Sequence, residues 1–244
     1  MIGWLGNRRL SAFALPRQEF TSESLSDKDF GDIFRTCAPY IARHRAEGCV
    51  IHIPGHVIED VDLLDEIMTD VSILHLLGVH LVLVMGVREQ LERKLTAAGI
   101  SMEMANGIRV TDERTLSLLK ESCGLARYEI ERSLTRAFSG QQSINVVSGN
   151  SFYTAKPIGV REGVDYINAG EVRRVESDNI KRRLQDNDII LLSPVGYSNS
   201  GESFSVMSED LAAAVASGIG ANKVVFYSEG EALIDRRTKK RLAS

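Results

Sequence analysis

The 244-residue chain contains few of the residues that stabilise small secreted domains or span membranes. Its three cysteines, Cys37, Cys49 and Cys123, are odd in number and widely spaced, which predicts neither a disulfide framework nor a zinc site. No apolar run approaches the roughly 20 residues that a membrane-spanning helix needs. We therefore expect a cytoplasmic protein with reduced thiols, no membrane partner and no bound metal.

An excess of positive charge is also missing, because the formal net charge is -4. Nucleic-acid-binding domains usually carry a basic surface, so we expect no nucleic-acid partner. The basic run at residues 236–241 is typical of a solvated tail. The first 18 residues hold arginines and no acid, a composition that an organellar transit peptide shares, but a frayed terminus is the favoured interpretation.

The remainder of the chain alternates between two kinds of pattern. Continuous apolar runs predict buried strands at residues 49–53, 80–85, 144–148, 188–193 and 223–227. Periodic apolar stripes predict helices at residues 59–77, 88–98, 112–138, 178–185 and 209–217, with Thr111 as an N-cap. Residues 163–167 and 171–175 flank "NAG" and predict a β-hairpin. The alternation indicates an α/β fold, a three-layer αβα sandwich with a mostly parallel central sheet.

A further helix is expected before the first strand, within residues 27–48. Apolar residues recur on one of its faces: Phe30, Phe34, Cys37, Tyr40 and Ile41. Pro39 is expected to kink or interrupt it. Either a partner covers this stripe or it packs on its own domain. The expected organisation is a flexible segment (1–26), this N-terminal helix (27–48), the main domain (49–230) and a linker or truncated tail (231–244).

Glycine-containing loops follow several of the predicted strands. They occupy residues 54–56, 86–88, 148–150 and 193–206. Ligands of open α/β sheets bind just past the carboxyl ends of the strands, and glycines there let backbone N–H groups approach an anion. The four loops together predict a ligand cleft at this edge of the sheet.

Several strings along the chain point to one family. "NGIRVTD", "GVDYINAGEVRRVE" and "SPVGYSNSGESF", together with "INVVSGN", resemble the amino-acid-kinase-like domain of N-acetylglutamate synthase over about residues 30–230. The resemblance implies the amino acid kinase, or carbamate kinase-like, fold. It also implies a regulatory domain that senses L-arginine in the first step of arginine biosynthesis and is not itself a kinase. The alternative is an ATP-dependent kinase of the N-acetylglutamate kinase type.

Four positions depart from the kinase pattern. Ser205 and Glu209 align with an asparagine and an aspartate of those kinases. His52 stands where those kinases carry a lysine, and Pro54 replaces a glycine. A neutral imidazole offers no fixed charge at pH 7 to the transferring phosphoryl group, and proline has no backbone N–H for phosphate. The chain also stops shortly after the point where the nucleotide-binding segment would begin. These departures argue against phosphoryl transfer.

What remains of the substrate cleft is assigned by the same resemblance. It would comprise Gly55, Gly86, Arg109, Asn145, Glu202, Ser203 and Glu209, with no catalytic residue. Tyr40 and Lys223 are the expected contacts for the L-arginine effector. Arg109 either grips a carboxylate, as its planar guanidinium suits, or pairs with Asp112. Glu202 and Ser203 are expected to line the cleft. For Ser203, capping of a helix is the alternative.

The resemblance also predicts partners. Full synthases carry an acetyltransferase domain after this one, and that domain binds acetyl-CoA. We therefore expect no cofactor in this chain and an acetyltransferase domain that acts with it in cis or in trans. The family's N-terminal helix joins domains into hexamers, so a homo-oligomer is expected.

Overall fold

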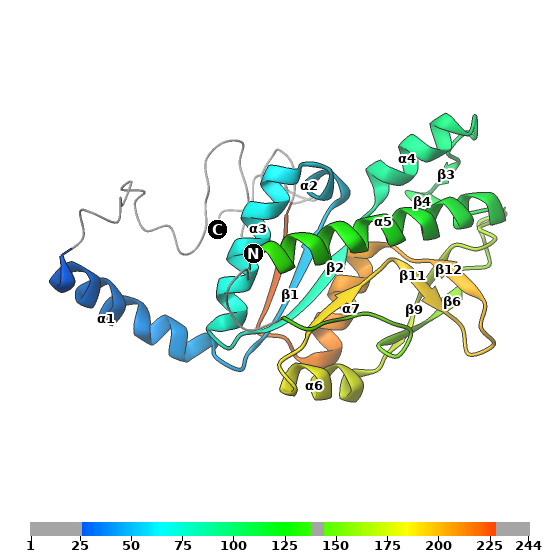
Figure 1. Ribbon diagram of the computed structural model, residues 1–244. Helices are drawn as coiled ribbons and strands as arrows, with labels where there is room; N and C mark the ends of the chain where they lie inside the picture. The colour runs from blue at the N-terminus through cyan, green and yellow to red at the C-terminus, as the bar shows by residue number, and fades with distance from the viewer. Residues whose placement is uncertain (1–25, 138–143, 228–244) are drawn as a thin grey trace, which may run out of the picture.

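The computed structural model describes residues 26–137 and 144–227 (Figure 1). The helices are α1 (Asp27–His44), α2 (Gly55–Glu59), α3 (Val61–Leu76), α4 (Arg88–Ala97), α5 (Glu113–Ala137), α6 (Ser177–Gln185) and α7 (Ser208–Ile219). No helix within the described ranges is long and apolar enough to cross a bilayer. The predictions for residues 1–25 and 231–244 lie outside the described residues.

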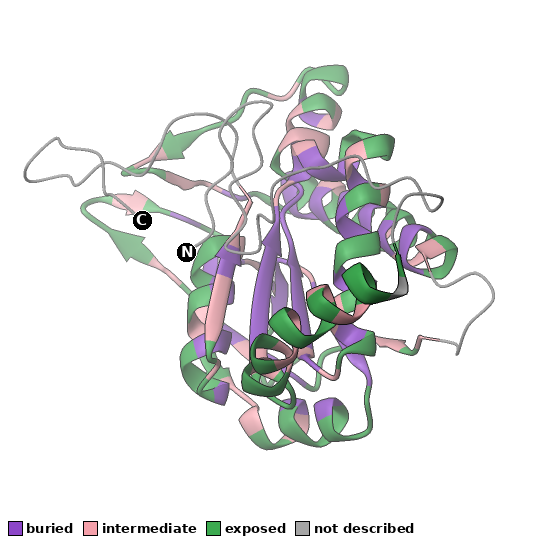
Figure 2. Cartoon of the chain, turned by 90° about the vertical axis from the view of Figure 1, so that its left-hand side faces the viewer, coloured by how far each residue is buried: buried purple, intermediate pink, exposed green. Residues whose placement is uncertain are grey.

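The centre of the molecule is a five-stranded parallel sheet. Its strands are β1 (Gly48–Ile53), β2 (His80–Met85), β5 (Val146–Val147), β10 (Ile189–Leu192) and β13 (Lys223–Phe226), in the order β13-β1-β2-β10-β5. Every neighbouring pair runs parallel. Figure 2 shows that these strands carry most of the buried backbone at the centre of the fold. Burial on both faces explains why the strands read as continuous apolar runs.

Helices cover both faces of this sheet. Ile51 and Ile53 of β1 pack with α3, α4 and α5 on one face, whereas Val50 packs with α6 and α7 on the other. Successive side chains of a strand point to opposite faces, so one strand contributes to two separate cores. The three-layer αβα sandwich with a parallel central sheet is therefore confirmed.

A second sheet lies beyond the carboxyl ends of the first. It has the order β12-β11-β6-β9 and comprises β6 (Tyr153–Pro157), β9 (Gly170–Val175), β11 (Val195–Tyr197) and β12 (Ser203–Ser205). Two small ribbons complete the fold: β3 (Met104–Ala105) with β4 (Ile108–Arg109), and β7 (Val160–Arg161) with β8 (Val164–Asp165).

The predicted hairpin of residues 163–167 with 171–175 is wrong. The first segment pairs with β7, and β9 pairs antiparallel with β6. Local turn residues indicated a reversal at "NAG", but strand partners are chosen by side-chain packing across the sheet. A Cβ on Gly170 would lie 2.6 Å from Phe204 Cβ and 2.9 Å from Lys156 O, so glycine is needed where β9 packs against β12 and β6.

Two helix boundaries also differ from expectation. The helix predicted at residues 59–77 is α3, which begins at Val61 because Asp60 Oδ1 accepts from Leu63 N (3.1 Å); the short α2 before it was not predicted. The N-cap of α5 is Asp112, not Thr111: Asp112 Oδ1 accepts from Thr115 N at 2.7 Å. Thr111 is instead fully buried and bonds through its backbone to residues 166 and 168.

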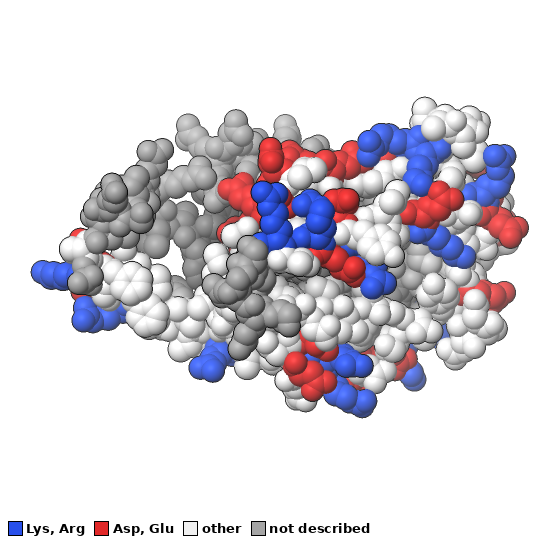
Figure 3. All heavy atoms as spheres, in the orientation of Figure 1, with Lys and Arg blue, Asp and Glu red and all other residues white. Residues whose placement is uncertain are grey.

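Helix α1 projects away from the rest of the molecule (Figure 1). It continues through Pro39, so the predicted interruption is wrong. Ile41 and His44 of its last turns line a cavity that residues of α3 also line. Its aromatic face is open, with Phe30 65%, Phe34 58% and Tyr40 56% exposed. The space-filling view shows a largely uncharged surface over this helix (Figure 3). Phe30 and Phe34 at the start of the stripe are thus not packed on the domain among the described residues, whereas Tyr40 and Ile41 near its end line the cavity beside α3.

Candidate functional site

The expected cleft begins at the carboxyl end of β1, where His52 is 3% exposed. Its Nε2 lies 2.9 Å from Ser208 Oγ, which in turn lies 3.0 Å from Glu209 Oε2. Because the serine proton goes to the carboxylate, the histidine must donate its Nε2–H to the hydroxyl. Burial lowers the pKa of His52, against the opposing effect of Glu209. The side chain is therefore neutral at pH 7, and its proton holds Ser208 in place.

Glycines pack tightly around this histidine. A Cβ on Gly86 would lie 3.3 Å from Pro54 Cα and 3.4 Å from both His52 Nε2 and Ser208 Oγ, so β2 can approach β1 here only without a side chain. At Gly55 a Cβ would overlap the side chains of α4, and Gln90 Nε2 donates to the Gly55 carbonyl at 2.8 Å. The glycine loop thus packs on protein rather than facing an open cradle.

Arg109 lies at the end of β4, half buried. Its Nε is buried and has no hydrogen-bond partner within the described residues. Burial lowers the pKa of the guanidinium; Glu92 opposes this and Arg88 adds to it. Asp112 is not its partner in the structure: the charged neighbours that affect Arg109 are Glu92 and Arg88, and the one that affects Asp112 is Arg114. A carboxylate ligand for Arg109 remains a prediction.

The structure brings only part of the predicted cleft together. Gly86 and Glu209 meet around His52 and Ser208. Asn145 does not belong there: its Nδ2 donates to Asp188 Oδ1 (2.7 Å), and both residues precede the amino ends of their strands. The structure therefore does not bring Asn145 to the cleft but places it at the opposite, amino-terminal edge of the sheet, and a ligand contact for it stays a prediction.

The remaining two predicted residues belong to the β11–β12 hairpin. Glu202 closes its turn, accepting from Ser198 Oγ at 3.3 Å and from Ser200 Oγ at 3.0 Å. Ser203 pairs with Tyr197 across the hairpin and does not cap a helix. Both side chains therefore have local structural partners, and a ligand contact for either stays a prediction.

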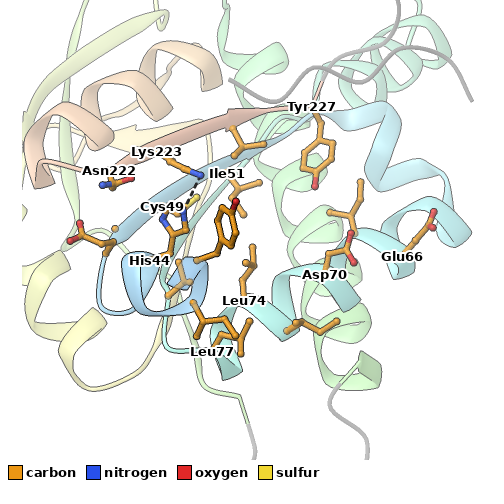
Figure 4. Close-up of a pocket in the computed structure, with 18 of the residues that line it drawn as sticks. His44, Cys49, Ile51, Glu66, Asp70, Leu74, Leu77, Asn222, Lys223 and Tyr227 are labelled. Atoms are coloured by element: carbon orange, nitrogen blue, oxygen red, sulfur yellow. Dashed lines mark hydrogen bonds between the residues drawn. The ribbon is translucent and has the colours of Figure 1, made fainter. Parts of the chain in front are cut away.

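A separate cavity of about 470 Å³ lies between α1, α3, β1 and β13. Both predicted effector residues, Tyr40 and Lys223, line it. Figure 4 shows Lys223 and His44 on one side and Glu66 and Asp70 on the other. Its floor and walls are mainly apolar and include Cys49, Ile51, Ile67, Leu74, Leu77 and Val225.

Charge is unevenly distributed around this cavity. Lys223 Nζ lies 3.4 Å from His44 Nε2. Burial, Lys223 and Arg43 together lower the pKa of His44, so its neutral ring accepts from the ammonium. Burial also raises the pKa of Cys49 to about 11, which keeps that thiol protonated. The cavity therefore offers the cation of Lys223, two carboxylates from α3 and a further carboxylate, Glu47, from the residue before β1.

Sequence reasoning missed the carboxylates of this cavity. Glu66 and Asp70 are four residues apart on α3 and so share one face of the helix. An acid pair at that spacing, on the helix expected beside the effector residues, was the available signal. Ser208 was also missed as the partner of His52, because the contact joins residues 156 positions apart.

Comparison with known proteins gives a consistent result. Residues 47–242 match the amino acid kinase family. The chain is 39% identical over 202 residues to an amino-acid acetyltransferase of Mannheimia succiniciproducens, covering 83% of this chain and 46% of the relative. It is 43% identical over 205 residues to one of Pseudomonas fluorescens, covering 82% and 47%. The chain thus spans about half the length of the curated relatives it matches.

Solved structures agree. N-acetylglutamate synthase from Neisseria gonorrhoeae, complexed with coenzyme A and L-arginine, superposes with a TM-score of 0.78 at 33% identity, covering 85% of this chain and 49% of that one. Carbamate kinase from Giardia lamblia bound to AMP-PNP gives a TM-score of 0.54 at 14% identity, covering 78% and 72%, and shares the fold alone.

Proposed function

The chain belongs to the amino acid kinase family, and we propose that it is the regulatory domain of an N-acetylglutamate synthase. Such an enzyme transfers the acetyl group of acetyl-CoA to L-glutamate. The relatives named as amino-acid acetyltransferases, of which this chain matches about half, support this proposal. The transfer itself would require an acetyltransferase domain, in cis or in trans, that supplies the acetyl-CoA site.

The effector of this domain would be L-arginine, bound in the cavity between α1 and α3. The observation that carries this proposal is the charge pattern of that cavity: Lys223 on one side, Glu66 and Asp70 on the other, a further carboxylate from Glu47, and apolar walls. L-arginine has the complementary pattern, a carboxylate, two cationic groups and an aliphatic stem. A guanidinium and a carboxylate form paired, charge-assisted hydrogen bonds.

Calorimetric titration of the full chain with L-arginine tests this. We expect saturable binding, weakened about tenfold or more by Asp70→Asn or Glu66→Gln, because a buried cation of the ligand loses its partner. Glu202→Gln, on the distant hairpin, is the matched control and should bind normally. L-citrulline, a neutral isostere of the ligand, should not bind. Equal binding of both ligands, or normal binding by both cavity variants, would contradict the proposal.

Phosphoryl transfer is not expected from this chain. The neutral, buried His52 and the missing N–H of Pro54 support this view, because the transferring group needs fixed positive charge and N–H donors. Incubation with ATP, Mg²⁺ and N-acetyl-L-glutamate should release no ADP above a protein-free blank. Steady turnover that the variant His52→Ala abolishes would instead identify a kinase.

A further inference from the structure

Asp65 of α3 joins two helices that lie far apart in the sequence. Its Oδ1 accepts a hydrogen bond from Ser133 Oγ at 2.6 Å, and its Oδ2 accepts one from Arg136 Nη1 at 2.7 Å. Arg132 Nη2 lies 3.5 Å from Oδ1. All three donors belong to α5, so one carboxylate of α3 holds three side chains of a single neighbouring helix. We call these four residues the Asp65 clamp.

The clamp is partly shielded from solvent. Ser133 is buried, and Asp65 is half-buried. The hydrogen bond from Ser133 is the largest cause that lowers the pKa of Asp65; the two arginines lower it further, and burial opposes them. The carboxylate is therefore charged at pH 7. Hydrogen bonds to a charged group in such a setting are stronger than those of fully exposed ion pairs.

The clamp fixes how α3 lies along α5. The two helices also share apolar contacts, because Leu64 and Met68 of α3 belong to the same core as Ile130 and Leu134 of α5. Apolar attraction is non-directional, whereas a hydrogen bond weakens steeply when its donor and acceptor move out of line. The polar contacts of Asp65 therefore specify the position of one helix against the other.

Helix α3 forms a wall of the proposed effector cavity. Glu66 follows Asp65 directly in the sequence and Asp70 lies one turn further on, and both line that cavity. Asp65 itself is not among the lining residues. A change in the position or mobility of α3 therefore affects both carboxylates that L-arginine would contact.

Helix α5 extends from the clamp to a different part of the molecule. Its middle residues, among them Lys120 and Gly124, line a second cavity of about 370 Å³ at the carboxyl edge of the central sheet. This cavity shares no lining residue with the effector cavity. The clamp thus joins a wall of one cavity to the helix that lines the other.

From these contacts we infer that Asp65 is a positioning residue that couples occupancy of the effector cavity to α5. This inference rests on the proposed function, because it takes L-arginine as the ligand. L-arginine bound to Glu66 and Asp70 restrains α3, and the clamp transmits that restraint to the last turns of α5. Two sites are coupled when each of them biases the same structural element, and here that element is the α3–α5 pair.

Amide hydrogen exchange of the full chain, measured by mass spectrometry with and without saturating L-arginine, tests the inference. We expect L-arginine to slow exchange about fivefold in α3 and in residues 126–137 of α5. Asp65→Ala should retain the effect in α3 and lose it in α5. Glu121→Ala breaks the 2.7 Å ion pair with Lys94, which joins α5 to α4, and is the matched control that should behave like the parent.

A second variant covers the case in which Asp65→Ala does not fold. Asp65→Asn keeps an oxygen acceptor for Ser133 but offers no charge to the two arginines, so it should fold and show a smaller effect in α5 than the parent. The coupling is overturned if bound L-arginine slows exchange in α3 alone, if both Asp65 variants keep the full effect in α5, or if Glu121→Ala loses it equally. Absence of any L-arginine binding in the calorimetric titration would instead reject the proposed effector and this coupling with it.

Discussion

Among single residues, three histidines have the clearest physical consequence: His52 and His75 are buried, and His44 is half-buried. His44, His52 and His75 each have a lowered pKa, and burial is the largest cause in every case. Each of these histidines has a lower pKa in the folded protein than its ordinary value of 6.5. As the pH falls, the unfolded chain therefore binds more protons than the folded one. These side chains therefore stabilise the fold fully above that value and progressively less below it.

The free energy of unfolding should accordingly be lower at about pH 5.5 than at about pH 7.5, a window above the range where paired carboxylates titrate. Urea denaturation at the two pH values measures this. His52→Gln keeps an N–H donor for Ser208 but cannot titrate, so its stability should change less with pH. A parent protein that is equally or more stable at the lower pH would refute this interpretation.

At the scale of the secondary-structure elements, single aspartates decide where helices begin. Asp60 separates α2 from α3, and Asp112 begins α5; each accepts a hydrogen bond from a backbone N–H three residues on. Patterns of apolar residues do not locate such caps, since a cap is a polar residue outside the stripe, and the predicted helix accordingly began at residue 59 instead of Val61. A side-chain carboxylate satisfies an N–H that the helix itself leaves unpaired.

Replacement of the α5 cap tests its contribution. Asp112→Ala should lower the free energy of unfolding by about 1 kcal/mol, because the Thr115 N–H loses its acceptor. Asp112→Asn retains an oxygen acceptor and should remain close to the parent. Chemical denaturation of the three proteins supplies the comparison. An alanine variant as stable as the parent would mean that Thr111 or water replaces the cap.

At the scale of the whole molecule, the projecting α1 calls for a partner. A contiguous aromatic face on a helix that stands away from its own core is typical of an association surface. Phe30 and Phe34 stack with their ring centroids 6.4 Å apart. We propose that a second copy of the chain covers this face, so that the protein is a homo-oligomer. The family resemblance implies that this oligomer is a hexamer.

Charges on that face should dissociate the assembly. The double variant Phe30→Glu, Phe34→Glu is expected to reduce the molar mass measured by size-exclusion chromatography with light scattering, because glutamates cannot be buried without partners. Val160→Glu on β7 is the control at a comparably exposed position, 67% against 65% for Phe30. A parent that elutes as a monomer, or a variant that retains its mass, would exclude this interface.

The prediction of the fold succeeded for those strands and helices whose burial produces a continuous or periodic pattern of apolar residues in the sequence. Strand β2 has the predicted bounds, and the other central strands and the helices α4 to α7 lie within a few residues of theirs. The second sheet was not predicted in its actual pairing, because the alternating residues of β6 and β9 select each other across the fold.

The sequence by itself determined the α/β architecture, since two-sided burial requires continuous apolar strands and one-sided burial requires periodic helices. It also determined the lack of a fixed charge at residue 52 and, by resemblance, two residues of the effector cavity. Only the tertiary structure decided which side chains meet: Ser208 with His52, Glu66 and Asp70 opposite Lys223, and Asn145 with Asp188 at the far edge. These contacts join segments that are far apart in the sequence. A local sequence pattern indicates which side chains are buried, but it does not indicate which distant side chain each of them contacts.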